Sequence, residues 1–205
     1  MSLPKRPAFR VERVGWARAD RLARALAARI VASGFKPNLI VAIARGGLIP
    51  ARLLADRLLV RDIASFRIEH YWLSAGAPKK ARLMLRLPVP IAGRKVLLVD
   101  DITDTGDTLA LAVRYLRAQR PAQLRSAVLQ HKLTAHFKPD FVGQIIRRWR
   151  WITYPWAAYE DALDLSKRVY KLGMSAAALR AALLRRFGVK FSIAELSVVL
   201  RSLRR

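Results

Sequence analysis

The sequence predicts an α/β fold with an open, mainly parallel sheet and flanking helices. Two runs, residues 38–44 and 96–99, are apolar apart from Asn38, and each leads into a short polar loop that is followed by a predicted helix. Fully apolar runs of this length are typical of parallel strands that are buried on both faces. Because such sheets bind ligands at the carboxyl ends of their strands, we expect the two loops to form the functional site.

Composition and length exclude several classes of protein. The chain has 205 residues, enough for one domain with an extension, and it contains no cysteine. Disulfides, thiolate nucleophiles and cysteine metal sites are therefore excluded. We expect a cytoplasmic protein without membrane contact, because the sequence shows neither the roughly 18 apolar residues of a membrane span nor a signal peptide. The formal charge of +25 predicts anionic ligands or partners.

The first elements are predicted from local patterns. Residues 9–14 fit a short edge strand, and residues 18–33 place their apolar side chains on one face of a helix that Gly34 is positioned to end. The buried strand 38–44 follows, and its loop leads into a helix over residues 48–59.

The middle of the chain continues the alternation of strands and loops. Residues 62–72 are predicted to form a third strand, and residues 74–82 are small, polar and basic, which is typical of a mobile loop. A solvated basic loop without a ligand is the alternative interpretation. Residues 83–87 and 124–130 are predicted strands, and a further strand is expected to begin near residue 138.

The stretch from Val96 to Leu109 carries the clearest chemical pattern. The apolar strand ends at two adjacent carboxylates, Asp100 and Asp101, and a polar loop containing Gly106 precedes the next helix. Free amides at the start of a helix suit a phosphate, whereas paired carboxylates suit ribose hydroxyls and a hydrated magnesium ion. An ordinary solvated acidic turn is the alternative.

This stretch resembles the 5-phosphoribosyl pyrophosphate (PRPP) signature of the type I phosphoribosyltransferases. The resemblance runs from about Val14 to Trp156 and is to the bacterial xanthine-guanine (6-oxopurine) members of that family. It implies the type I phosphoribosyltransferase fold, PRPP as a substrate and Mg²⁺ as cofactor, with Asp100 and Asp101 holding the ribose and the metal. It also implies that one loop binds the 5′-phosphate, formed by Thr103, Asp104, Thr105, Gly106, Asp107 and Thr108.

The resemblance further implies a pyrophosphate site built from two segments. The glycines of the first let backbone amides approach a ligand closely, and its arginine can pair with an anion. A tight strand–helix turn would explain these glycines equally well. The implied pyrophosphate-binding residues are Ala44, Arg45, Gly46 and Gly47 in the first segment, and Lys79, Lys80 and Arg82 in the basic loop.

A base site is expected after the last strands. The resemblance implies that Trp151 stacks on a purine, that Ile152 offers backbone groups to its edge, and that Lys132 donates to the exocyclic O6. A lysine ammonium has only donors, so it favours a 6-oxopurine over adenine. Asp104 is the candidate catalytic residue, accepting the purine N7 proton. Resembled proteins have an acidic residue where this chain has Ala157, so the choice among guanine, hypoxanthine and xanthine stays open.

The end of the chain lies outside the resemblance. We expect a phosphoribosyltransferase domain over residues 1–159, with a base-binding hood at about 132–159, and a helical extension over 160–205. The extension is predicted to pack on the domain or on a second subunit of a homo-oligomer, dimer or larger. Its arginines make a nucleic-acid-binding unit the alternative. Its predicted helices span residues 162–172, 175–187 and 192–203.

Two functions are therefore carried forward. The first is a magnesium-dependent purine phosphoribosyltransferase of purine salvage, and the second is a PRPP-sensing, nucleic-acid-binding regulator on the same fold, since fold alone does not fix function. The base site of Lys132 and Trp151 favours the enzyme, because a sensor of PRPP has no need of it.

Overall fold

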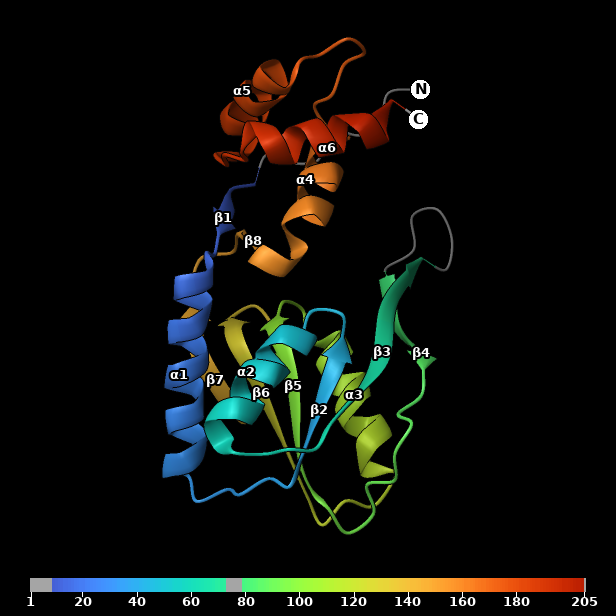
Figure 1. The fold of residues 1–205 in the computed structure, drawn as a ribbon. Helices are drawn as coiled ribbons and strands as arrows, with labels where there is room; N and C mark the ends of the chain where they lie inside the picture. Colours follow the sequence, from blue (N-terminus) through green and yellow to red (C-terminus); the bar gives the residue numbers. More distant parts are fainter. Residues whose placement is uncertain (1–8, 73–78, 205) are drawn as a thin grey trace. The chain divides into compact units, whose positions relative to one another are not determined.

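The computed structural model describes residues 9–72 and 79–204 and confirms the predicted α/β fold (Figure 1). One sheet has six strands in the order β4-β3-β2-β5-β6-β7, and its neighbours are parallel except for the antiparallel pair β3 and β4. The strands are β2 (Leu39–Ala44), β3 (Ile63–Trp72), β4 (Lys79–Leu85), β5 (Lys95–Thr103), β6 (Gln123–Lys132) and β7 (Phe141–Ile146).

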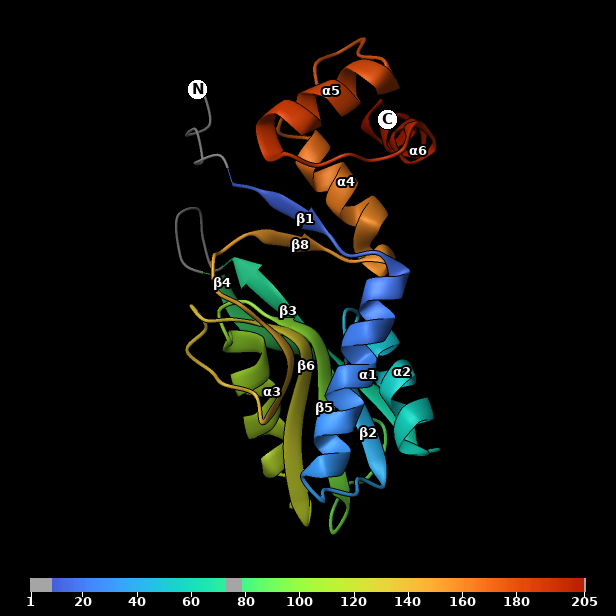
Figure 2. The ribbon, with the colours of Figure 1, turned by 90° about the vertical axis from the view of Figure 1, so that its left-hand side faces the viewer.

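Helices cover both faces of this sheet. Helices α1 (Trp16–Ala32) and α2 (Leu48–Leu58) lie on one face, and α3 (Asp107–Arg117) lies on the other (Figure 2). The apolar runs are buried as predicted: Leu39 to Ile43 of β2 and Val96 to Val99 of β5 are at most 2% exposed. Double coverage explains why these two strands show no alternation of apolar and polar residues.

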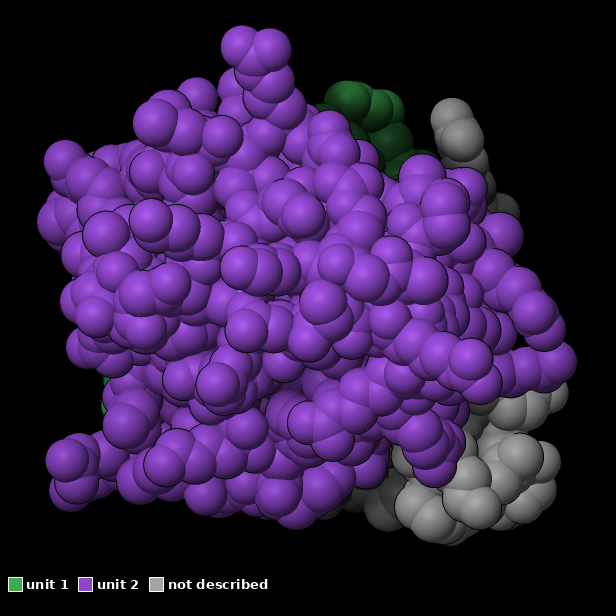
Figure 3. Space-filling view, turned by 90° about the horizontal axis from the view of Figure 1, so that it is seen from below, with its two compact units in different colours: residues 1–16, 150–205 green, residues 17–149 purple. Residues whose placement is uncertain are grey.

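The chain divides into two compact units, which Figure 3 colours separately. Residues 17–149 contain the six-stranded sheet and are called the sheet unit; residues 1–16 and 150–205 are called the helical unit. In the helical unit, β1 (Val11–Arg13) pairs in parallel with β8 (Trp151–Thr153). Its helical segments are a 3-10 turn (Pro155–Ala157), α4 (Ala158–Ser166), α5 (Ala176–Phe187) and α6 (Ile193–Leu203).

The helical unit has its own apolar core. Leu179 and Leu183 of α5 and Leu196 of α6 are fully buried, and Val11 of β1 packs in the same cluster. Arg13, two residues further along β1, makes a 2.7 Å ion pair with Glu195 of α6. Serine residues cap both helices: Ser175 caps α5, and Ser192 forms a capping box with Glu195 at the start of α6. The tail therefore packs against the beginning of the chain within this unit.

Some element boundaries differ from the sequence prediction. The segment 79–82 was expected to be loop but belongs to β4, where it pairs with β3; the rest of the predicted loop, residues 74–78, lies outside the described residues. Helix α4 begins four residues earlier than expected and ends at Ser166. The compact units divide at residues 16 and 149, whereas the functional boundary expected after residue 159 stays a prediction.

Within the described residues, every helix is too short or too polar to cross a membrane.

Candidate active site

Two loops meet at the carboxyl ends of the neighbouring strands β2 and β5. The strands pair in parallel from Leu39 opposite Val96, so the Arg45–Gly47 loop and the carboxylates of β5 share one edge of the sheet. A Cβ built on Gly46 would lie 2.6 Å from Oδ2 of Asp101. The two predicted motifs, far apart in sequence, are therefore in direct contact.

The second glycine of this loop is enclosed by backbone. A Cβ on Gly47 would meet the carbonyl oxygen of Val99 and would lie 2.8 Å from that of Ile43. Gly47 is therefore required for the loop to pack against the sheet, whereas Gly46 faces a side chain of the site. The exposed Arg45 precedes them, and the Ala44–Arg45 peptide bond is cis.

Asp100 and Asp101 concentrate negative charge at the end of β5. Both are partly buried, and the backbone N–H of Asp101 donates to Oδ1 of Asp100 over 2.9 Å. Burial and the neighbouring Asp101 carboxylate raise the pKa of Asp100 well above its ordinary value, against the lowering effect of that hydrogen bond. Hydroxyl donors or a cation would relieve this excess charge.

The carboxylate pair fits a magnesium ion that takes its remaining ligands from substrate and water. Within residues 9–72 and 79–204, no cluster of three or more carboxylate or imidazole side chains could hold a metal alone. Mg²⁺ commonly binds through one or two carboxylates together with substrate phosphates and water, which is what Asp100 and Asp101 can offer.

The loop between β5 and α3 is the candidate phosphate site. Gly106 precedes α3 with φ +104°, and a Cβ there would lie 2.7 Å from the backbone nitrogen of Phe137. Only glycine adopts this conformation easily. The turn at Gly106 places the first backbone N–H groups of α3 at the loop, where they could donate to a phosphate. Thr105 donates to Asp107 over 2.8 Å, which fixes the turn. The hydroxyl of Thr103 is buried and has no hydrogen-bond partner in the described part of the chain.

The side chains of Asp104, Lys132 and Trp149 contact one another beside this loop. Nζ of Lys132, at the end of β6, lies 2.9 Å from Oδ2 of Asp104, and Lys132 is only 2% exposed. The indole N–H of Trp149 donates to Oδ1 of Asp104 over 3.0 Å, and Nζ of Lys132 lies 4.3 Å from the centre of the Trp149 ring. Burial lowers the pKa of Lys132, and its hydrogen bond to Asp104 opposes that shift.

Trp149 was not assigned a role from the sequence. It belongs to the aromatic stretch that includes Trp151, but its contacts with Asp104 and Lys132 span 45 and 17 residues of sequence, respectively, and no local pattern marks them. The only feature of the sequence that could have pointed to Trp149 is the high density of tryptophan after β7.

The two other predicted base-binding residues lie in the helical unit. Trp151 and Ile152 are in β8, where they pair with β1 and are 39% and 8% exposed. Trp151 hydrogen-bonds through its side chain to Asp161, which is 8% exposed. Burial, and to a lesser degree the charges of neighbouring acids, raise the pKa of Asp161 to about 6. The base-binding assignments of Trp151 and Ile152 stay predictions.

The basic residues assigned to pyrophosphate lie in a strand. Lys79 and Lys80 belong to β4, and Arg82, which is exposed, stands opposite Glu69 of β3. A contact between these residues and pyrophosphate stays a prediction.

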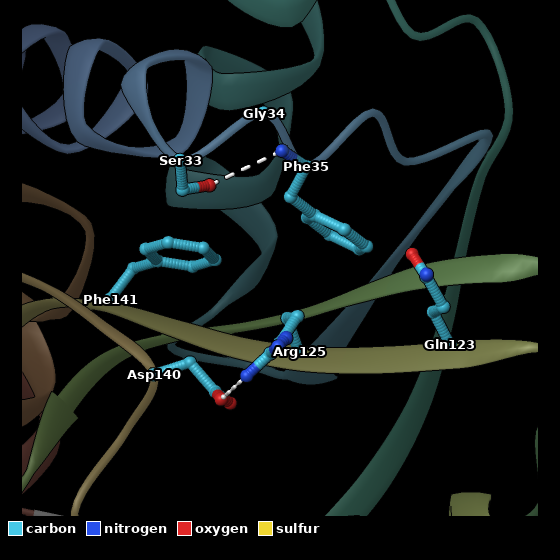
Figure 4. Close-up of a pocket in the computed structure, with 7 residues that line it drawn as sticks. All are labelled: Ser33, Gly34, Phe35, Gln123, Arg125, Asp140 and Phe141. Atoms are coloured by element: carbon cyan, nitrogen blue, oxygen red, sulfur yellow. Dashed lines mark hydrogen bonds and ion pairs between the residues drawn. The ribbon is translucent and has the colours of Figure 1, made fainter.

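A cavity of about 330 Å³ lies at the opposite, amino ends of β6 and β7 (Figure 4). Asp140 in its wall accepts hydrogen bonds from Arg125 and from the backbone and hydroxyl of Ser126, and these bonds hold the pKa of Asp140 low. The rings of Phe35 and Phe141 stack nearby at 6.3 Å. The polar groups serve the packing of the strands, so this cavity is a weaker candidate site.

Comparison with known proteins places this geometry in a family. Residues 16–161 match the phosphoribosyl transferase domain. Over 157 residues the chain is 31% identical to the xanthine-guanine phosphoribosyltransferase of Roseobacter denitrificans, covering 70% of this chain and 83% of that protein. It is 34% identical over 159 residues to the protein of the same name from Chromohalobacter salexigens, covering 73% and 88%. The purine phosphoribosyltransferase of Pyrococcus horikoshii has a TM-score of 0.62 at 27% identity, covering 71% of this chain and 93% of that one.

Proposed function

We propose that this chain, which belongs to the phosphoribosyl transferase family, transfers the 5-phosphoribosyl group of PRPP to a 6-oxopurine. The products are the nucleoside monophosphate and pyrophosphate. The observation that carries the proposal is the buried ammonium of Lys132 standing 2.9 Å from the carboxylate of Asp104. The names of the two bacterial relatives, xanthine-guanine phosphoribosyltransferases, support the same substrate class.

The pair matches one edge of a 6-oxopurine. O6 and N7 are neighbours on that edge, and O6 is an acceptor. When N7 carries the proton, the edge presents an acceptor beside a donor. Lys132 can donate to O6 while Asp104 accepts from N7–H, and the ion pair already sets this donor beside this acceptor. Adenine has an amino group in place of O6, so it would face the ammonium with a second donor.

Transfer then needs one proton acceptor and a positioned leaving group. The purine N9 attacks C1 of the ribose while pyrophosphate departs, and Asp104 accepts the N7 proton. The Arg45–Gly47 loop is assigned to the pyrophosphate, Asp100 and Asp101 to the ribose hydroxyls, and the loop before α3 to the 5′-phosphate. Mg²⁺, when bound, would neutralise charge on the pyrophosphate. Most of the acceleration is expected from positioning and electrostatic stabilisation.

The base-stacking role is assigned to Trp151. Its side chain is 39% exposed and hydrogen-bonds to Asp161, which holds the aromatic ring in one orientation within the helical unit. Ile152, the next residue of β8, is assigned to the edge of the base through its backbone.

A turnover assay with four bases tests the proposal. The protein, PRPP and Mg²⁺ are mixed with hypoxanthine, guanine, xanthine or adenine, and nucleotide and pyrophosphate are quantified by chromatography. At least one 6-oxopurine should react with a kcat/KM roughly 100-fold above that of adenine, because adenine leaves a buried donor unpaired. Equal use of adenine would overturn the substrate class. PRPP binding without turnover of any base would favour the regulator instead.

A further inference from the structure

The side chain of Trp149 contacts both members of the proposed base-recognition pair. Its indole N–H donates to Oδ1 of Asp104 over 3.0 Å, and its ring centre lies 4.3 Å from Nζ of Lys132. Trp149 follows β7, Asp104 lies in the loop between β5 and α3, and Lys132 is the last residue of β6. One residue therefore links three neighbouring segments at the carboxyl edge of the sheet.

One contact fixes the orientation of the Asp104 carboxylate, and the other restricts the position of the Lys132 ammonium. A carboxylate can turn either oxygen toward an ammonium, but the indole N–H occupies Oδ1 of Asp104 and leaves Oδ2 toward Lys132. A lysine side chain is long and has several rotatable bonds, and the aromatic face attracts its ammonium on one side. Together the two contacts hold the ammonium of Lys132 and Oδ2 of Asp104 in one relative orientation.

We propose that Trp149 is a positioning residue that aligns Lys132 and Asp104 with the O6–N7 edge of the base. The inference rests on the proposed function and adds a determinant of its base selectivity. Trp149 acts through its two neighbours and is given no part in the reacting bonds. Its loss should therefore reduce the use of 6-oxopurines and their advantage over adenine, while PRPP binding persists.

Two substitutions separate the contacts. Trp149→Phe keeps an aromatic face for Lys132 but removes the N–H donor to Asp104, and Trp149→Leu removes both. The matched control is Trp16→Phe, which makes the same substitution at a tryptophan that is 60% exposed and belongs to the helical unit. Thermal unfolding and PRPP titration establish that each variant is folded.

Steady-state kinetics with hypoxanthine and adenine supply the decisive numbers. Loss of a hydrogen bond to a charged group corresponds to about a tenfold fall or more in kcat/KM for hypoxanthine in Trp149→Phe. Trp149→Leu should fall further, and the ratio of hypoxanthine to adenine should fall with it. The KM for PRPP should stay within about twofold of the parent, as should all constants of Trp16→Phe.

Three results would overturn the inference. The first is an unchanged hypoxanthine to adenine ratio in Trp149→Leu. The second is a rise in the KM for PRPP that matches the loss with hypoxanthine, because a general structural role would affect both substrates. The third is a parent protein that uses none of the 6-oxopurines, which overturns the proposed function as well. An active parent with unaffected Trp149 variants removes the inference alone.

Discussion

Replacing Gly46 by alanine tests the contact between the two PRPP loops with the smallest possible change. The φ angle of Gly46 lies outside the left-handed region, so the backbone accepts alanine. The new Cβ would lie 2.6 Å from Oδ2 and 2.8 Å from Cγ of Asp101. To reach ordinary van der Waals contact, which begins at 3.4 Å, the carboxylate must withdraw by about 0.8 Å.

This displacement should affect ligand binding more than folding. Asp101 is a partly buried side chain at the end of β5 and can rotate, so the free energy of unfolding should change by less than about 0.5 kcal/mol. A ribose or metal contact made by this carboxylate would be misplaced. Loss of a hydrogen bond to a charged group costs about 1.5–3 kcal/mol, or roughly a 10- to 150-fold weaker affinity for PRPP.

The neighbouring glycine and a distant one provide the controls. A Cβ on Gly47 would meet backbone oxygens of Val99 and Ile43, which cannot rotate away, so Gly47→Ala should cost about 1–3 kcal/mol of stability. Gly15→Ala adds a Cβ with no atom within 4 Å and should change neither property. PRPP affinity is measured by calorimetry with Mg²⁺ and stability by thermal unfolding. Full PRPP affinity in folded Gly46→Ala would refute a role for Asp101 in PRPP binding.

Three further predictions concern the base edge and the helical unit. Lys132→Ala should lower kcat/KM for hypoxanthine by about 10- to 150-fold, from the loss of a charged donor, and lower that for adenine much less; equal losses would place Lys132 away from O6. The pKa of Asp161 is about 6 in the folded protein and 3.8 ordinarily, so the folded state favours the protonated carboxyl. The stability that this preference contributes is complete below pH 4 and is lost as the pH rises through 6. Asp161→Asn should therefore have the same thermal stability as the parent near pH 4 and be more stable by up to about 3 kcal/mol at pH 8. The same dependence of stability on pH in the two proteins would contradict this prediction. Truncation after Tyr159 removes the apolar core that buries Val11, which pairs with Trp151 between β1 and β8. The truncated protein should therefore be less stable and bind the base more weakly, while its affinity for PRPP persists. Unchanged base affinity would show that the tail does not support the base site.

The parts of the site that follow a buried strand could be predicted from the sequence. The apolar run ending at Val99 predicted a strand, and the carboxylates after it were expected at the carboxyl edge, where they lie. The contact of Gly46 with Asp101 depends on β2 and β5 being neighbours in the sheet, which the sequence did not indicate, because β3 and β4 lie between them along the chain.

Contacts that cross the fold could not be predicted in the same way. The apolar residues of the tail indicated a face to bury, but nothing in their spacing showed that β1, at the other end of the chain, would share their core. The contacts of Trp149 with Lys132 and Asp104 likewise depend on three segments converging. Lys79 and Lys80 were expected in a loop because small residues, glycine and proline precede them and because both are charged, whereas pairing with β3 extends the strand to Lys79. Tertiary pairing outweighed the local signal there.

Calorimetric titration of PRPP into the parent and into the double variant Asp100→Asn, Asp101→Asn tests whether the carboxylates at the end of β5 bind PRPP. Substitution by asparagine keeps the size of both side chains and removes both negative charges. The parent should bind PRPP in the presence of Mg²⁺. The double variant should bind at least about 100-fold more weakly, because two charged contacts are lost, and its circular dichroism and thermal unfolding should show an intact fold. Equal PRPP affinity in the two proteins would contradict the assignment of this edge of the sheet as the PRPP site.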